Sequence, residues 1–149
     1  PYWNQRARGA ILGLTRGFSR SHLVRATLES LAYQTYDIAR AMERDSGIKI
    51  AELKVDGGAS ANDLLMQMQS DFSALTVEIS SNPEATAQGA AFLAGLAVGF
   101  FADRAELKRL VSVKKSFEPR MSAEERAARL DGWHRAVAAC RTFSEKVER

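Results

Sequence analysis

The sequence predicts an α/β fold in which helices connect the strands of a parallel sheet. Two short apolar runs, residues 53–55 and 76–80, have the length and the flanking polar or glycine residues of buried strands. Longer segments surround both runs, and their apolar residues recur every three or four positions, as on one face of a helix. Because a helix separates the two strands, a crossover connection joins them and they are expected to run parallel.

The first helix is predicted from Ser21 onward, after a short extended segment at residues 8–15. Ser19 or Ser21 can accept a hydrogen bond from the first free N–H groups, and Gly47 can end the helix. Apolar positions at helical spacing predict a single buried stripe along this helix. The stripe comprises Val24, Leu28, Leu31, Thr35, Ile38 and Met42.

The second helix is predicted over residues 62–74, directly after an Asp-Gly-Gly turn. Its buried face is expected to contain Leu64, Leu65, Met68 and Phe72. The strand that follows, residues 76–80, places Val77 and Ile79 on one side of the sheet, because side chains alternate along a strand.

A third helix is predicted over residues 82–98. Asn82 is a good N-cap residue, and Pro83 suits the first helical turn. The part from residue 85 to residue 98 is rich in alanine and glycine. We therefore expect this helix to pack closely on a flat surface such as a sheet.

The C-terminal part of the chain predicts a helical tail. A short helix over residues 103–110 precedes an extended, loop-like stretch at residues 112–119. The last helix is predicted to start at Ser122, because Ser122 and Glu125 have the spacing of a capping box. Its apolar stripe comprises Leu130, Trp133, Val137, Cys140 and Val147.

The composition argues against several classes of partner. Hydrophobic residues make up 46% of the chain and charged residues 26%, as in ordinary globular proteins. The net charge of +3 comes from interspersed charges of both signs, without a basic block that contains aromatic residues, so we expect no nucleic-acid partner. The most apolar segment, residues 85–101, is too short to span a membrane, so we expect no membrane partner.

Cysteine and histidine are scarce in this sequence. Cys140 is the only cysteine, and His22 and His134 are the only histidines. These residues predict no metal site, because a typical cluster needs several cysteine or histidine ligands. A single cysteine cannot form an internal disulfide, which fits a reducing, cytoplasmic location.

The turn formed by Asp56, Gly57 and Gly58 is the strongest candidate for a binding site. A glycine pair between a strand and a helix lets the backbone approach a ligand without interference from Cβ atoms. The helix that follows directs its free N–H groups and its positive dipole end at the same place, which suits part of a nucleotide. Asp-Gly-Gly also occurs in ordinary turns, so the residues alone leave both interpretations open.

A second motif lies upstream, where the run at residues 9–14 is followed after seven residues by residues 22–29. This motif resembles the second signature of the FGGY carbohydrate kinases. Within that family the chain is most similar to the glycerol kinase branch, in register from Pro1 to about Arg135. The segments that carry the resemblance are Pro1-Tyr2-Trp3, Ala7-Arg8-Gly9, Gly13-Leu14-Thr15-Arg16-Gly17, Arg25-Ala26-Thr27-Leu28-Glu29, Ala32-Tyr33-Gln34-Thr35, Asp45-Ser46-Gly47-Ile48-Lys49, Val55-Asp56-Gly57-Gly58-Ala59, Gln67-Met68-Gln69-Ser70-Asp71 and the stretch from Gly89 to Phe100.

The resemblance implies both a fold and an activity. The fold is the second half of the C-terminal actin-like ATPase (ribonuclease H-like) domain, with a sheet that is incomplete within residues 1–149. The N-terminal domain, which holds glycerol in this family, would then be absent. The implied intact enzyme transfers a phosphoryl group from ATP to glycerol, with Mg²⁺ bound mainly by residues outside this chain. We expect this chain alone to be inactive.

The resemblance also implies a set of binding residues. In similar kinases the second glycine of the turn and the asparagine four residues later contact ATP, which corresponds to Gly58 and Asn62. We therefore expect Gly57, Gly58, Ala59 and Asn62 to bind the nucleoside, and we expect no catalytic or metal-binding residue in this chain. Asn62 can cap the following helix at the same time, because a cap uses only its amide oxygen.

Two positions depart from the commonest glycerol kinase sequence, namely Ser60 and Asp63. A carboxylate is favourable in the first turn of a helix but unfavourable beside a phosphate, so the phosphates are expected to lie away from Asp63. Asp56 is expected to cap the turn rather than to bind a metal or a phosphate-bound water. We interpret His22 as a polar residue at a helix start and Arg16 as a solvated loop arginine.

Two alternatives stay open at this point. The chain could belong to a kinase of the same superfamily with another polyol or ketose substrate, because the substrate-binding residues lie elsewhere. It could also be a non-enzymatic interaction module with the same fold. An incomplete sheet would expose a large apolar face, so we expect the chain to pair with a second copy as a homo-oligomer or else to be only marginally stable.

Overall fold

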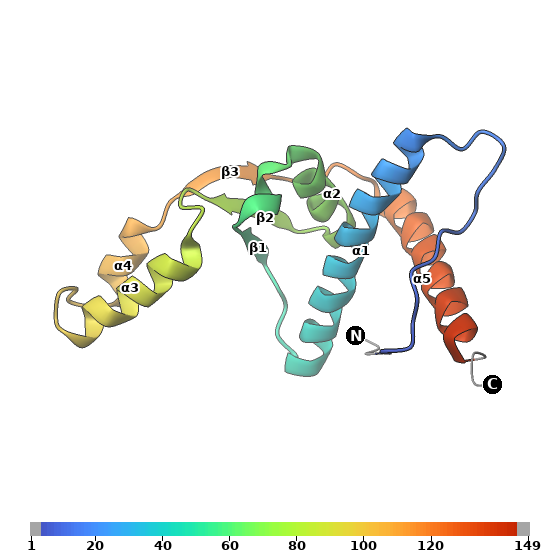
Figure 1. The fold of residues 1–149 in the computed structure, drawn as a ribbon. Coiled ribbons are helices and arrows are strands. Elements are labelled where there is room, and N and C mark those ends of the chain that lie inside the picture. The colour runs from blue at the N-terminus through green and yellow to red at the C-terminus, as the bar shows by residue number, and fades with distance from the viewer. Residues whose placement is uncertain (1–3, 146–149) are drawn as a thin grey trace.

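A computed structural model of the chain describes residues 4–145 and has three strands at its centre. Helices gather at both ends of the sheet, so that the molecule is elongated (Figure 1). The elements are α1 (Arg20–Ser46), β1 (Glu52–Val55), the 3₁₀ helix η1 (Gly58–Ala61), α2 (Asp63–Ser73), β2 (Thr76–Ser80), α3 (Ala85–Ala97), α4 (Arg104–Leu110), β3 (Val113–Phe117) and α5 (Ala123–Glu145). Within residues 4–145, no helix combines the length and the apolar character needed to cross a membrane.

The sheet has the order β1-β2-β3. Strands β1 and β2 are parallel, with Leu53 opposite Val77, which confirms the predicted crossover arrangement. Strand β3 pairs antiparallel with β2 and places Phe117 opposite Val77. The stretch at residues 112–119 was predicted to be extended and loop-like; the extended conformation is confirmed, but residues 113–117 form a strand rather than a loop. Only Phe117 is buried in this strand, so the sequence lacks the apolar alternation by which a strand is recognised.

The core lies on one face of the sheet, beneath α2. Val77 and Ile79 point into it, as predicted, and meet Phe72 and Met66 of α2. Helix α1 packs against α2 from the outside, and the ring of its Tyr33 lies 4.2 Å from the ring of Phe72 between centroids. Side chains of α2 therefore connect the sheet to α1.

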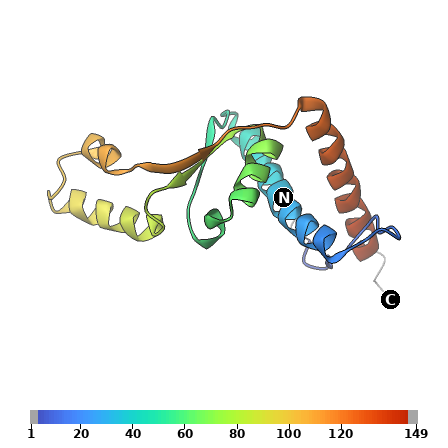
Figure 2. The same ribbon diagram turned by 90° about the horizontal axis from the view of Figure 1, so that it is seen from above.

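The opposite face of the sheet is polar, and this explains the position of α3. Strand alternation places Glu52, Lys54 and Glu78 on that face, away from the core. Helix α3 was predicted to pack flat on the sheet, but Gly95 is its only buried residue among the described ones. Figures 1 and 2 show α3 and α4 extending away from the strands, at the end of the molecule opposite α5. A charged sheet surface cannot bury an apolar helix without loss of solvation.

Helix α3 also begins later than predicted. Its first residue is Ala85, and Glu84 occupies the N-cap position. Asn82 was expected to be the N-cap, but its Oδ1 accepts a hydrogen bond from the N–H of Glu84 at 2.9 Å. This contact is local to the turn, and asparagine side chains commonly stabilise turns in this way.

The predicted caps of α1 are confirmed. The Oγ of Ser19 accepts from the N–H of His22, and the imidazole of His22 accepts from the N–H of Ser19. His22 is thus a polar residue at the helix start, as expected. Gly47 ends the helix in the left-handed conformation, with φ of 70°. The preceding residues 8–15 form no strand and are mostly exposed.

The predicted buried stripe of α1 is wrong for most of its members. Val24, Leu31, Ile38 and Met42 are all about half exposed or more, and Leu28 is only partly buried. The buried residues of α1 are Ala32, Tyr33 and Ala39. The helix has two faces with apolar residues, and hydrophobic spacing does not reveal which of them another element covers. On α2, Leu64 is likewise exposed, whereas Leu65, Met68 and Phe72 are buried as predicted.

Helix α5 packs against α1 through aromatic and charged contacts. Leu130 is buried, and the indole of Trp133 stacks on Tyr33 at 5.3 Å between ring centroids. The Nε1–H of Trp133 donates to the carboxylate of Asp37 at 2.8 Å. Burial raises the pKa of Tyr33, and the nearby carboxylate of Glu29 adds to this effect. Val147, the last member of the predicted stripe, lies outside the described residues.

Candidate functional site

The turn after β1 contains a glycine that its conformation requires. Gly57 has φ of 80° and ψ of 179°, a region that is accessible essentially to glycine alone. The hydroxyl of Ser60 donates to the carbonyl oxygen of Gly57 at 2.7 Å, and the backbone N–H of Ser60 donates to the same oxygen. These bonds hold the backbone of η1 in place and satisfy the hydroxyl of Ser60, which is buried.

Gly58 differs from its neighbour, because nothing within the chain requires glycine there. Its φ lies outside the left-handed region, so other residues could adopt the same backbone conformation. A Cβ atom built on Gly58 would meet no described atom within 4 Å. The missing side chain therefore leaves an open approach to the backbone at the start of η1.

Asn62 caps α2, as predicted. The N–H of Leu65 donates to the Oδ1 of Asn62 at 3.1 Å, so the amide oxygen is used in the cap. The amide nitrogen of Asn62 donates to no atom of the described residues and can serve a ligand. The carboxylate of Asp63, next in the chain, pairs with the ammonium of Lys115. This ion pair offsets part of the negative charge beside the turn.

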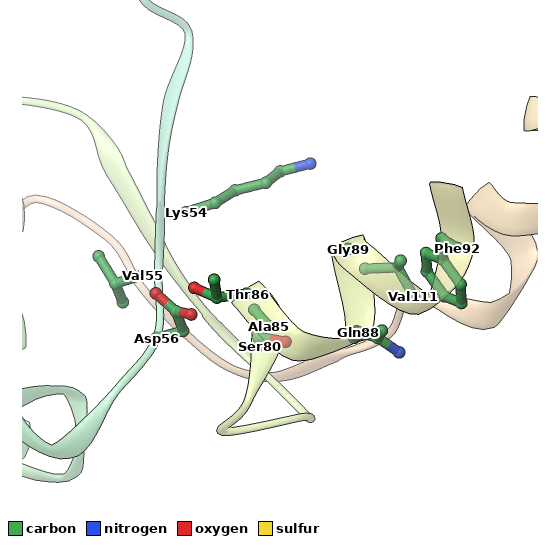
Figure 3. Close-up of a pocket in the computed structure, with 10 residues that line it drawn as sticks. All are labelled: Lys54, Val55, Asp56, Ser80, Ala85, Thr86, Gln88, Gly89, Phe92 and Val111. Atoms are coloured by element: carbon green, nitrogen blue, oxygen red, sulfur yellow. The ribbon is translucent and has the colours of Figure 1, made fainter. Parts of the chain in front are cut away.

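A cavity of about 410 Å³ lies beside this turn, where the ends of β1 and β2 meet the start of α3 (Figure 3). Its polar lining includes Asp56, Ser80, Thr86 and Gln88, and Phe92 contributes an apolar wall. The predicted residues Gly57, Gly58, Ala59 and Asn62 do not line this cavity. They follow Asp56 directly in the chain, so the turn and the cavity are adjacent.

Asp56 does not have the role that we predicted for it. Its carboxylate was expected to cap the turn, but η1 has no side-chain cap, and no described atom forms a hydrogen bond with Asp56. Figure 3 shows the carboxylate turned toward the hydroxyl of Thr86 on α3. Because β2 leads directly into α3, the parallel pair brings residues from two separate parts of the chain to one edge of the sheet.

Lys54 contributes a cation to the cavity lining, but its ammonium already forms an ion pair. Its Nζ lies 2.9 Å from the Oε1 of Glu52 on the same strand. The hydrogen bond to Glu52 raises the pKa of Lys54, with a further contribution from the same carboxylate charge. In Figure 3 the side chain of Lys54 extends away from Asp56. The cavity thus has an uncompensated carboxylate at one side and no free cation opposite to it among its described lining residues.

The remaining candidates from the sequence lie outside this region. Arg16 is exposed in the loop before α1 and forms no ion pair with any described residue, which agrees with a solvated arginine. Residues 4–145 contain no group of three or more histidine, cysteine or acidic side chains that could hold a metal ion. Thr86 and Gln88 were missed in the sequence because they lie in a helix whose small residues indicated packing. Their position after the neighbouring parallel strand was the signal that could have identified them.

Comparison with known proteins gives a consistent result. Residues 1–98 match the C-terminal domain of the FGGY family of carbohydrate kinases. The glycerol kinase of Carboxydothermus hydrogenoformans is 58% identical over 143 residues, which cover 96% of this chain and 29% of that protein. The glycerol kinase of Enterococcus casseliflavus is 52% identical over 149 residues, which cover the whole chain and 29% of that protein. The chain thus spans less than a third of the length of these relatives.

Solved structures agree with this result. The glycerol kinase of Plasmodium falciparum, crystallised with ADP, superposes with a TM-score of 0.86 at 35% identity, over 94% of this chain and 28% of that structure. The gluconate kinase of Lactobacillus acidophilus shares the fold, with a TM-score of 0.80 at 22% identity, over 97% of this chain and 29% of that structure. These neighbours confirm the predicted actin-like α/β fold, and the chain belongs to the FGGY family of carbohydrate kinases, in the part that corresponds to their C-terminal domain.

Proposed function

We propose that this chain is the nucleoside-binding part of a glycerol kinase, which converts glycerol and ATP into glycerol 3-phosphate and ADP. Relatives named glycerol kinase at 51–58% identity support the proposal, as does the ADP-bound structural neighbour. Because the chain spans about 29% of these relatives, the activity belongs to a full-length kinase that contains it.

The observation that carries the proposal is the free space at Gly58. Neither the backbone conformation nor a neighbouring atom accounts for glycine at this position. A ligand that contacts the backbone would account for it, because any side chain would occupy the space of that ligand. Gly57 positions Gly58, because its unusual backbone conformation directs the chain into η1.

The neighbouring residues fit a nucleoside in this space. Ala59 adds only a methyl group beside the approach, and the amide nitrogen of Asn62 can donate to an acceptor on a base. The free N–H groups at the start of η1 and α2 favour partial negative charge on a ligand. The phosphates would extend toward residues outside this chain. Mg²⁺ bound there would neutralise charge that develops during phosphoryl transfer.

The alternatives have different consequences. Gluconate and xylulose kinases share the fold at 22–24% identity, so the choice of glycerol rests on the closer relatives. A non-enzymatic interaction module would have no reason to bind ATP at this turn. The cytoplasmic location and the homo-oligomeric state remain predictions.

Gly58→Val in the full-length kinase is expected to raise the Kd for ATP at least about tenfold, a loss of roughly 1.4 kcal/mol or more. A Cβ atom at this position meets no described atom within 4 Å, whereas the branched side chain would occupy the space of the nucleoside. Isothermal titration with ATP and steady-state kinetics with glycerol as the varied substrate measure the two effects separately. Gly132→Val on α5 is the matched control, because a Cβ atom there also meets nothing within 4 Å. A higher KM for glycerol with unchanged ATP binding would refute the assignment.

The purified 149-residue chain is expected to show no glycerol phosphorylation above background. Phosphoryl transfer requires a base, Mg²⁺ ligands and groups that hold the γ-phosphate, and the proposed site supplies only nucleoside contacts. A coupled assay that detects ADP, with and without glycerol, makes the measurement. Glycerol-dependent ADP formation would show that the catalytic groups lie within this chain.

A further inference from the structure

The cavity beside the turn is lined by exposed polar groups that have no partner among the described residues. The carboxylate of Asp56 and the hydroxyl of Thr86 both line it, and neither forms a hydrogen bond within residues 4–145. Asp56 follows β1 and Thr86 lies on α3, and Figure 3 shows their two side chains turned toward one another. Gln88 and Phe92 of α3 line the same space.

The charges of the cavity indicate which ligands it can accept. An ionised carboxylate is a hydrogen-bond acceptor and repels phosphate, and the Lys54 ammonium that could offset it is paired with Glu52. A hydroxyl pair on a sugar fits this arrangement, because each hydroxyl can donate one proton and accept another. Thr86 can donate to or accept from the same pair, and Phe92 offers an apolar surface for the carbon atoms of the ring.

We propose that Asp56 and Thr86 bind the vicinal hydroxyls of the ribose, so that this cavity selects ribonucleotides over deoxyribonucleotides. The inference rests on the proposed function, because the nucleoside is placed by the turn at Gly57 and Gly58. Asp56 directly precedes that turn, so a ribose bound beside it lies within reach of the carboxylate. Carboxylates at the end of a parallel strand bind ribose hydroxyls in the same way in other α/β folds. A free polyol carries the same diol, and it is the second possible source.

The test compares ATP, 2′-deoxy-ATP and 3′-deoxy-ATP in the full-length kinase. The Kd values are measured by equilibrium dialysis, and the KM for glycerol is measured in parallel. The unmodified kinase is expected to bind ATP on the order of tenfold more tightly than either deoxynucleotide. Asp56→Asn and Thr86→Val preserve side-chain size, and each is expected to weaken the binding of ATP more than the binding of either deoxynucleotide, which has already lost one of the two hydroxyls. The selectivity should therefore fall toward one.

Asp131→Asn is the matched control, because it makes the same replacement at an exposed carboxylate of α5 that lies outside the cavity. It should leave the selectivity unchanged. Thermal melting of each variant, followed by circular dichroism, shows that the fold is retained. If Asp56→Asn does not fold, Thr86→Val alone decides the outcome.

The remaining outcomes separate the sources of the diol. A higher KM for glycerol in both variants, with unchanged nucleotide selectivity, would keep the diol site but assign it to a polyol. Equal binding of ATP and both deoxynucleotides by the unmodified kinase, with an unchanged KM for glycerol in the variants, would overturn the inference. The proposed function would stand in that case if Gly58→Val still weakened ATP binding, so the two failures can be distinguished.

Discussion

Phe72→Ala is expected to remove a large part of the stability of the isolated chain. Phe72 is only 1% exposed, and its ring packs between the sheet and Tyr33 of α1. Truncation of a buried phenylalanine costs about 3–5 kcal/mol, from lost burial and from the cavity that remains. A domain of this size is typically stable by about 5–15 kcal/mol, and this chain leaves many large apolar side chains exposed. The loss would therefore be a large fraction of its free energy of unfolding.

Urea unfolding, monitored by circular dichroism, measures this loss. The urea concentration at the midpoint of unfolding should fall, and the dependence of the free energy of unfolding on urea should stay similar. Phe100→Ala is the matched control, because the same truncation at a residue that is 77% exposed should change the free energy of unfolding little. If Phe72→Ala were as stable as the control, α2 would not be the element that joins the sheet to α1.

The sequence predicted the local elements well where the signals are local. Strand β2 has the predicted bounds, with Val77 and Ile79 inward, because an alternating apolar pattern between turn residues allows few other conformations. The caps at Ser19 and Asn62 were also foreseen, since each depends on contacts within one helical turn. Strand β3 was not predicted as a strand, because its pairing with β2 stabilises it and its own side-chain pattern does not indicate a strand.

The packing partners could not be read from hydrophobic spacing. The apolar stripe of α1 is real in the sequence, yet the covered face is the one with Ala32 and Tyr33, which meets α2. Ser70 is fully buried, where a surface position would be the usual assumption for serine. Its hydroxyl can bond to the carbonyl oxygens of Leu75 and Phe117, and these acceptors come together only in the folded chain.

The candidate site was predicted in part. Gly58 and Asn62 could be selected because a turn, a helix start and a family resemblance coincide in one short segment. Thr86 reaches the same edge of the sheet only through the parallel pairing of β1 and β2. Such long-range contacts depend on the topology of the sheet, and local sequence patterns do not indicate them.

The isolated chain is also expected to become more stable as its concentration rises. Val24, Leu31 and Ile38 are spaced by seven residues on α1 and remain about half exposed, and Met42 extends the same surface. Burial of this surface against a second copy would stabilise the folded state but not the unfolded chain. A rise in concentration to about a hundred times the dissociation constant would add about 2.7 kcal/mol, and the melting temperature would increase with it.

Thermal melts over a hundredfold concentration range, together with light scattering, test this expectation. Leu31→Lys places a charge in the apolar surface and should return the chain to a monomer with a constant melting temperature. Ala105→Lys adds the same charge at an exposed position of α4, at the other end of the molecule, and should leave association intact. If the unmodified chain is a monomer whose melting temperature does not depend on concentration, its described core keeps the chain folded without association. The exposed face of α1 then needs no second copy, and the homo-oligomer that we expect for this chain would lose its physical basis.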